Sequence, residues 1–305
     1  MRVFVTGATG WVGSAVVPEL IGAGHQVVGL ARSDASADAL AAAGAEPQRG
    51  ALDDLETLRS AAAASDGVIH LAFKHDQAFS GNFEAAADAD RRAIETFGAA
   101  LDGSHRPLVI ASGLAGQPPG VVVAENDVPD PNAPAGPRTH SERAALALAS
   151  SGVRSSSVRL APTVHGDGDH GFVATLVDIA RDKGVSGYIG DGTNHWPAVH
   201  RLDAARLFRL ALESAPAASV LHGAAEEGVP VRAIAEAIGR HLDVPVTSIA
   251  TEEAGEHFGW LAGFLALDVR ASSALTRNML GWQPSRPGLI DDLEQGHYFR
   301  EPAAA

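Results

Sequence analysis

Short apolar runs alternate with alanine- and leucine-rich stretches through the first half of the chain. The apolar runs are rich in β-branched residues and predict strands at Val3–Thr6, Gln26–Ala31, Glu46–Arg49, Gly67–Leu71, Leu108–Ser112 and Ser155–Leu160. The stretches between them repeat apolar positions about every 3.6 residues and predict helices at Trp11–Ala23, Ser36–Ala43, Leu55–Ala63, Asn82–Leu101 and Arg138–Ser151. Because strands alternate with helices, we expect an α/β fold with a doubly wound parallel sheet and helices on both faces.

The second half of the chain is less regular. It predicts helices at Phe172–Lys183, Ala204–Ser214, Val231–His241 and Ser272–Leu280, and strands at Val220–His222 and Val246–Ile249. We therefore expect one domain over residues 1–160 and a smaller α/β lobe over most of 161–305, with some segments returning to the first domain. Between Gly116 and Pro137, repeated proline and glycine predict a long loop, either a surface excursion or a lid.

Three glycines lie between the first strand and the first helix, in the segment Thr6-Gly7-Ala8-Thr9-Gly10-Trp11-Val12-Gly13. Glycines there permit a tight turn and let backbone N–H groups approach a pyrophosphate at a helix N-terminus. A merely tight turn is the alternative, but the flanking strand and helix favour dinucleotide binding by a Rossmann-type domain. The expected contacts come from this segment: Thr6, Gly7, Thr9, Gly10, Trp11, Val12 and Gly13.

The Gly-x-x-Gly-x-x-Gly spacing within Thr-Gly-Ala-Thr-Gly resembles the short-chain dehydrogenase/reductase superfamily. More narrowly, it is similar to the extended or atypical branch, near the NAD-dependent epimerase/dehydratase and NmrA-like relatives. The resemblance continues at His70–Ala72, Arg159–Gly166, Gly190–Gly192 and Val199–Ala205, and so spans most of the chain. It implies that residues 161–305 form mostly a substrate-binding lobe, with further cofactor contacts from Leu71, Ala72, Pro162 and Val164.

The second strand ends at Arg32, where NAD enzymes place an acid that binds the ribose 2′-hydroxyl. A guanidinium can chelate a 2′-phosphate instead, so we expect NADP(H) to be preferred, with NAD(H) as the alternative. Arg32 could also be a solvated loop cation, because Asp34 is close by in sequence. Relatives carry an Asp in the adenine-contacting loop where this chain has Ala51, followed by the expected contacts Leu52 and Asp53.

The superfamily's usual proton donor is the tyrosine of a Tyr-x-x-x-Lys pair. The chain has two tyrosines and two lysines in all, Tyr188, Tyr298, Lys74 and Lys183. Neither tyrosine precedes a lysine at that spacing, and the expected place in the fold carries Thr139 and Arg143. A threonine hydroxyl is too weak an acid for the role, whereas Arg143 could hold the nicotinamide ribose or be a surface charge.

Two other residues are candidates for the catalytic chemistry. Ser112 ends the predicted strand Leu108–Ser112 and could polarise a substrate oxygen, or could only form a turn. His75 follows the predicted strand Gly67–Leu71. Asp76 could support its imidazolium as an acid, or His75 could be a solvated loop residue. The segment His165–His170 holds two histidines and two aspartates, but it lacks an ordered ligand spacing, so we expect no metal.

Composition excludes several function classes. The chain has no cysteine, which excludes disulfides and thiolate chemistry, and its formal net charge of −14 without a basic stretch argues against nucleic acid. No apolar run approaches the roughly 20 residues that span a bilayer, and no secretion signal is apparent, so we expect a cytoplasmic protein without a membrane partner. The aromatic residues of the second half predict an apolar pocket over the nicotinamide or simply core packing: Phe172, Trp196, Phe258, Trp260, Phe264 and Trp282.

These features predict an NADP(H)-dependent oxidoreductase with an atypical active site. It would transfer a hydride to or from a small, apolar carbonyl, imine or activated alkene. A non-catalytic NAD(P)-binding regulator or redox sensor of the NmrA-like kind is the alternative, and a nucleotide-sugar epimerase or dehydratase is a third. The apolar stretch His257–Leu267 predicts a buried lobe or the contact of a homodimer.

Overall fold

The computed structural model describes residues 1–114, 120–129 and 136–300. Its centre is a seven-stranded parallel sheet in the order β11-β7-β5-β4-β1-β2-β3. The strands are β1 Arg2–Thr6, β2 Gln26–Ala31, β3 Glu46–Arg49, β4 Gly67–His70, β5 Pro107–Gly113, β7 Arg154–Leu160 and β11 Ser219–Gly223. The expected Rossmann-type α/β fold is confirmed.

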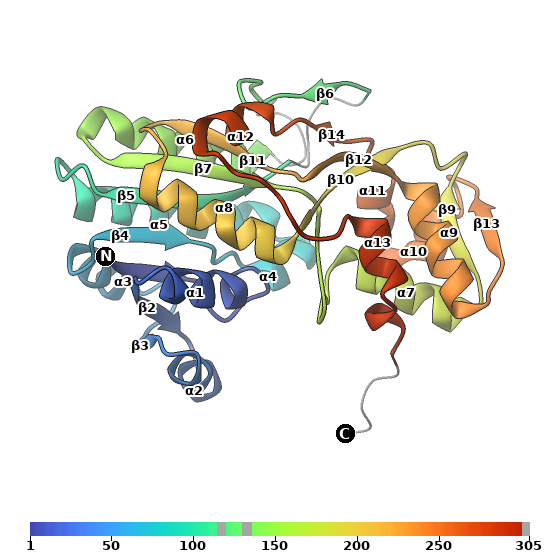
Figure 1. Ribbon diagram of the computed structural model, residues 1–305, viewed down its shortest axis with the longest axis horizontal. Helices are drawn as coiled ribbons and strands as arrows, with labels where there is room; N and C mark the ends of the chain where they lie inside the picture. The colour runs from blue at the N-terminus through green and yellow to red at the C-terminus, as the bar shows by residue number, and fades with distance from the viewer. Residues whose placement is uncertain (115–119, 130–135, 301–305) are drawn as a thin grey trace.

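Helices cover both faces of this sheet (Figure 1). They are α1 Gly13–Gly22, α2 Asp34–Ala42, α3 Leu55–Ala63, the short α4 His75–Phe79, α5 Phe83–Leu101, α6 Gly136–Ala147 with a 3-10 turn at Leu148–Ser151, and α8 Arg201–Ser214. Side chains alternate across β1: Val3 and Val5 pack with α1 and α8, whereas Phe4 packs with α3 and α5. This period-two alternation of buried apolar residues makes one sheet the shared wall of two cores.

A smaller lobe lies to the right of the sheet in Figure 1. Its short sheets are formed by β8 Thr163–His165, β10 His195–His200 and β12 Glu226–Pro230, by β9 Ser186–Ile189 with β13 Val246–Ile249, and by β6 Val122–Val123 with β14 Arg270–Ala271. Its helices are α7 Phe172–Lys183, α9 Val231–Leu242, α10 Ala254–Phe258, α11 Ala262–Leu265 and α13 Leu289–Glu294, with 3-10 turns at Gly259–Leu261 and His297–Phe299. These helices share one apolar core with Trp196 of β10.

The chain passes between the two units more than once. After β10 it returns to the sheet as α8 and β11, and α12 Ala274–Leu280 packs near them. Trp282 follows α12, is fully buried in the first core, and donates its indole N–H to the carbonyl of Asp203 at 3.0 Å. These return segments connect the lobe to the seven-stranded sheet.

The first-half elements match the sequence prediction within a few residues, but several later strands were missed. β8 has three residues and β9 has four. β10 is six residues long, but it contains Pro197 and shows no alternation of apolar and polar residues, so the sequence does not mark it as a strand. The predicted loop between Gly116 and Pro137 contains β6, and α6 already begins at Gly136; residues 115–119 and 130–135 of it lie outside the described residues. In the described parts of the chain, every helix is too short or too polar to cross a bilayer.

Candidate active site

The glycine turn between β1 and α1 is packed backbone against backbone. Gly7 has a φ of +65°, and a Cβ there would lie 2.7 Å from the amide nitrogen of Ala72 in the loop after β4. A Cβ on Gly13 would lie 2.0 Å from the carbonyl oxygen of Gly7. Only glycine fits at these two positions, because an added Cβ would lie against backbone atoms and the neighbouring backbone would have to move.

Three backbone amides at the start of α1 are available to a ligand. Inside the turn, the Gly10 amide donates to the Gly7 carbonyl at 3.0 Å and the Ser14 amide to the Gly10 carbonyl at 2.8 Å. Within the described chain, the amides of Trp11, Val12 and Gly13 have no hydrogen-bond acceptor, and no side chain caps α1. Free N–H groups at a helix N-terminus suit a diphosphate, so the residues present fit a dinucleotide.

A buried polar chain lies under this turn. Thr6 and His70 are partners across β1 and β4, and the Thr6 Oγ1 lies 2.6 Å from the His70 Nδ1. The opposite ring nitrogen, Nε2, lies 3.1 Å from a carboxylate oxygen of Asp90 in α5. The Ala72 amide donates to the Thr6 hydroxyl, which fixes the loop after β4 beside the turn.

The charge of Asp90 is retained despite its burial. Burial would by itself raise the pKa of Asp90, but the hydrogen bond from His70 and the positive charge of Arg138 outweigh it and hold that pKa below its ordinary value. Since a carboxylate only accepts, His70 must donate from Nε2, and in its neutral form it accepts from Thr6 at Nδ1. Our sequence reasoning missed Asp90, because Asp88, Arg91 and Arg92 beside it on the same helix make it resemble one more surface charge.

Trp11 joins the turn to the second lobe. Its indole N–H donates to the carbonyl of Val164 at 2.7 Å, and the Arg201 guanidinium lies 4.3 Å from its ring centroid. The His170 imidazole packs edge-on against the same ring. The structure therefore brings together three of the predicted cofactor segments: the glycine turn, Leu71–Ala72 and Val164.

The histidine- and aspartate-rich segment after β8 is held by side chains from the end of the chain. His165 contacts Asp292 at 2.8 Å, and the Tyr298 hydroxyl donates to Asp169 at 2.9 Å. Among the described residues no group of three or more His, Asp or Glu side chains is arranged to hold a metal ion. These contacts hold the segment to α13 and to the 3-10 turn His297–Phe299 within the smaller lobe.

Arg32 is exposed at the end of β2. The neighbouring acid, Asp34, is engaged by Arg49 at 2.7 Å, and no described residue forms an ion pair with Arg32. Farther along this edge, the Lys74 ammonium contacts both carboxylate oxygens of Asp53 at 2.7 Å. Leu52 is largely buried in the core, so only its exposed edge or backbone could contact an adenine.

A second group of side chains gathers where β4 and β5 end. Ser112 lies in β5 beside Ala111, whose carbonyl accepts from the Arg138 guanidinium at 2.7 Å. The Cζ atom of Arg138 lies 4.2 Å from the centroid of the Phe73 ring, and the His75 ring packs edge-on against the same ring, with the two ring centroids 5.1 Å apart. Surrounding protein and the charge of Arg138 lower the pKa of His75, which favours a neutral imidazole and disfavours the acid role that we expected for it.

The orientation of α6 is set by a buried ion pair. Glu142 contacts Arg159 of β7 at 2.9 Å, both side chains being only 4% exposed, and it accepts from the Ser157 hydroxyl. Residues four apart share a helix face, so Arg138 and Glu142 both face the strands. Thr139 is buried on a neighbouring face and Arg143 is exposed, and no described contact links either to the glycine turn.

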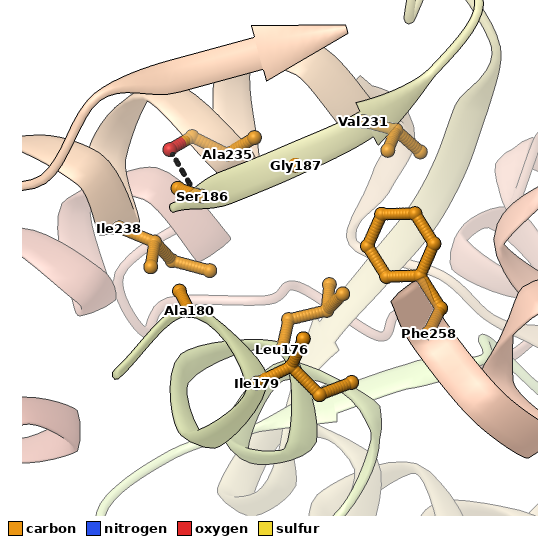
Figure 2. A pocket seen from close by; sticks show the side chains of 9 residues that line it. All are labelled: Leu176, Ile179, Ala180, Ser186, Gly187, Val231, Ala235, Ile238 and Phe258. Atoms are coloured by element: carbon orange, nitrogen blue, oxygen red, sulfur yellow. Dashed lines mark hydrogen bonds between the residues drawn. The ribbon is translucent and has the colours of Figure 1, made fainter. Parts of the chain in front are cut away.

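Most aromatic residues of the second lobe are core residues. Trp196, Phe258 and Trp282 are buried, whereas Trp260 is 50% exposed and packs with Phe172 and Phe264. The lobe also contains a small, mostly apolar pocket of about 10 Å³ between α7, α9 and β9, shown in Figure 2. That volume is at most the room for one water molecule, so the cavity is a packing gap and not a ligand site.

The fold and the glycine turn define a Rossmann-type dinucleotide-binding protein. Residues 3–221 match the model of the NAD dependent epimerase/dehydratase family, and the chain belongs to this family. Its members are NAD(P)-binding enzymes, so the family accounts for the turn and for the sheet that carries it.

Two curated relatives and a solved structure show the range of similar proteins. The chain is 49% identical, over 98% of its length and all of the relative's, to the uncharacterized protein C2A9.02 of Schizosaccharomyces pombe. It is 30% identical, over 60% of its length and 56% of the relative's, to a 4-hydroxy-2-methyl-3-oxo-4-farnesyl-3,4-dihydroquinoline-1-oxide ketoreductase of Stigmatella aurantiaca. The dTDP-glucose 4,6-dehydratase DesIV of Streptomyces venezuelae shares the fold at 21% identity, with a TM-score of 0.78 over 99% of this chain and 97% of its own.

Proposed function

We propose that this protein is an NADP(H)-dependent oxidoreductase that acts on a small, apolar carbonyl, imine or activated alkene. The observation that carries the proposal is the set of free amides at Trp11, Val12 and Gly13, which faces no acceptor within the described chain. When bound, the nicotinamide supplies or accepts a hydride at its C4 carbon. The chain's own residues bind the diphosphate and orient the nicotinamide ring through Trp11, which connects the glycine turn to the second lobe. They also line what we call the reaction edge, the edge of the sheet where β4 and β5 end and where Ser112, Phe73 and Arg138 lie.

Arg32 supports NADP(H) as the preferred cofactor. Its guanidinium is exposed and unpaired among the described residues, while Arg49 neutralises the nearest acid, Asp34. A free guanidinium at the end of β2 can chelate a 2′-phosphate, whereas a ribose hydroxyl gains little from it.

The proposed site is atypical because neither tyrosine is suited to donate a proton. Burial and the negative charge of Asp169 raise the pKa of Tyr298 far above its ordinary value, so the phenol keeps its proton. Tyr188 lies in β9 of the second lobe, packed beneath Arg232. Reduction of a carbonyl then requires that its oxygen take a proton from solvent or through Ser112, while hydride reaches the carbon.

Calorimetry with NADPH and NADH on the wild type and on Arg32→Ser tests the cofactor assignment. We expect the variant to bind NADPH about tenfold more weakly, a loss of about 1.4 kcal/mol, with NADH affinity unchanged. Arg59→Ser removes an equally exposed arginine from α3 and serves as the charge control. Equal NADPH and NADH affinities in the wild type would refute the preference for NADP(H).

NADPH consumption against a panel of ketones, imines and enones tests the reaction. Turnover of at least one class supports the oxidoreductase. Tight NADPH binding with no turnover in any class favours the alternative, a non-catalytic NAD(P)-binding regulator, which the unsuitable tyrosines would explain. Conversion of a nucleotide sugar into its epimer, or into a dehydrated keto sugar that is still bonded to the nucleotide, would instead favour an epimerase or dehydratase.

A further inference from the structure

Arg138 is held in place by two different elements of the reaction edge. Its guanidinium donates to the Ala111 carbonyl of β5 at 2.7 Å and stacks over the ring of Phe73, which follows β4. Glu142, one helical turn later, is locked to Arg159 and Ser157 of β7. The side chain of Arg138 is therefore positioned by β4, β5 and β7 together, at the edge of the sheet where ligands bind in open α/β folds.

The charge of Arg138 has no counter-ion among the described residues. No described carboxylate lies within ion-pairing distance, whereas Arg2, Arg91 and Arg209 each have one. The buried Asp90 is hydrogen-bonded to His70, and the charge of Arg138 helps to lower the pKa of Asp90, but the two side chains form no ion pair. Of the five N–H donors of a guanidinium, the Ala111 carbonyl takes one, and no described acceptor takes another.

A half-buried, unpaired guanidinium fixed on an aromatic ring is suited to a planar anion. Stacking on Phe73 leaves the edge of the group, with its parallel N–H donors, for a ligand in the ring plane. A carboxylate accepts two such bonds at once, which gives both charge compensation and orientation. A neutral ligand would leave the guanidinium without an ion-pair partner in a partly desolvated place.

We propose that Arg138 binds a carboxylate of the substrate, so that the substrate is a small oxo acid or its imine or alkene analogue. This inference rests on the proposed function and changes its substrate from an apolar molecule to one that carries a carboxylate besides the reacting carbonyl, imine or alkene. Arg138 thus determines substrate specificity from the same helix, α6, that carries Thr139 and Arg143.

Binding of matched acids and amides to the NADP⁺-loaded protein tests this role without turnover. The pairs are acetate and acetamide, butyrate and butyramide, and phenylacetate and phenylacetamide, titrated by calorimetry. We expect at least one acid to bind tenfold or more tightly than its amide. Arg138→Gln should reduce the preference to less than twofold, and Arg138→Lys should keep an acid preference at lower affinity, because the charge remains without the planar fork.

Arg92→Gln is the matched control, because Arg92 is exposed on α5 and lies outside the site. It should retain the wild-type preference. If no acid binds more tightly than its amide, or if Arg138→Gln keeps the preference, the role of Arg138 is refuted. Binding of inorganic phosphate in place of the acids would also refute a carboxylate site.

Uptake of NADP⁺ is measured first in the same experiment, which separates the two proposals. No uptake by the wild type overturns the proposed function and this inference together. Uptake without an acid preference overturns the inference alone. Where an acid is preferred, the same variants are also assayed with phenylpyruvate and with its methyl ester. Compared with the wild type, Arg138→Gln should raise the KM for phenylpyruvate tenfold or more and leave the KM for the ester unchanged, whereas Arg92→Gln should change neither KM.

Discussion

The glycine turn and the reaction edge lie close in the fold but are built in different ways. The turn works through backbone: its free amides and its two close approaches at Gly7 and Gly13 need no side chain at all. The reaction edge works through side chains from three elements, with Arg138 aimed by its contacts to Ala111 and Phe73. A site built from backbone depends on glycines at the positions where a side chain would collide. A site built from side chains depends on which face of a helix packs against the sheet.

The largest effect is expected where α6 is anchored. Glu142→Ala leaves the Arg159 charge buried without its partner and should lower the free energy of unfolding by about 3–5 kcal/mol, measured by urea denaturation. Glu95→Ala removes an exposed ion pair with Arg91 and should lower it by less than about 1 kcal/mol. Similar losses in both variants would show that the ion pair does not orient α6.

A methyl group in the turn should abolish cofactor binding. Gly13→Ala places a Cβ against the Gly7 carbonyl, so we expect NADPH affinity to fall at least a hundredfold, about 2.7 kcal/mol, by calorimetry. Gly22→Ala lies in the same helix with open space around the added Cβ, and should bind NADPH normally while stabilising the fold by up to about 1 kcal/mol. If Gly13→Ala bound NADPH as tightly as the wild type, the close backbone packing of the turn would not be needed for cofactor binding, and the contrast with the reaction edge would fail.

The polar chain beneath the turn should show in the pH dependence of stability. The folded-state pKa of Asp90 is depressed, so its contribution is complete above the unfolded value of about 3.9 and is lost as the pH falls through the folded value. Asp90→Asn should cost about 2 kcal/mol at pH 7, and the difference from wild type should shrink below about pH 3.9. Asp38→Asn, on the exposed face of α2, should leave the free energy of unfolding unchanged at pH 7 and below about pH 3.9 alike. A loss for Asp90→Asn that is the same at every pH would show that the charge of Asp90 does not stabilise the fold.

The smallest effect is expected at Arg143. Its side chain is exposed and contacts no described residue of the turn, so Arg143→Met should change the free energy of unfolding by less than about 0.5 kcal/mol and NADPH affinity by less than twofold. Parallel denaturation and calorimetry measure both. A tenfold loss of affinity for NADPH and NADH alike would indicate that Arg143 binds the nicotinamide ribose. It would then weaken the proposal that Arg138 is the residue of α6 that faces the ligand.

Several features of the protein could be predicted from sequence because they depend on local pattern. The sheet strands follow from β-branched runs, and the turn follows from glycines at fixed spacing after a strand. The short strands β8 to β10 could not be predicted in this way, because they are stabilised by partners distant in sequence, such as the pairing of His165 with His200.

The sequence by itself determined that the chain forms a doubly wound sheet and holds a glycine turn at the N-terminus of its first helix. Only the tertiary structure decided which residues of α6 face the strands, because a helix rotates by about 100° per residue and an offset of one residue selects a different face. The buried pair of Glu142 and Arg159 sets that rotation, and with it the position of Arg138. Such a contact joins two elements through space, and no local pattern along the chain records it.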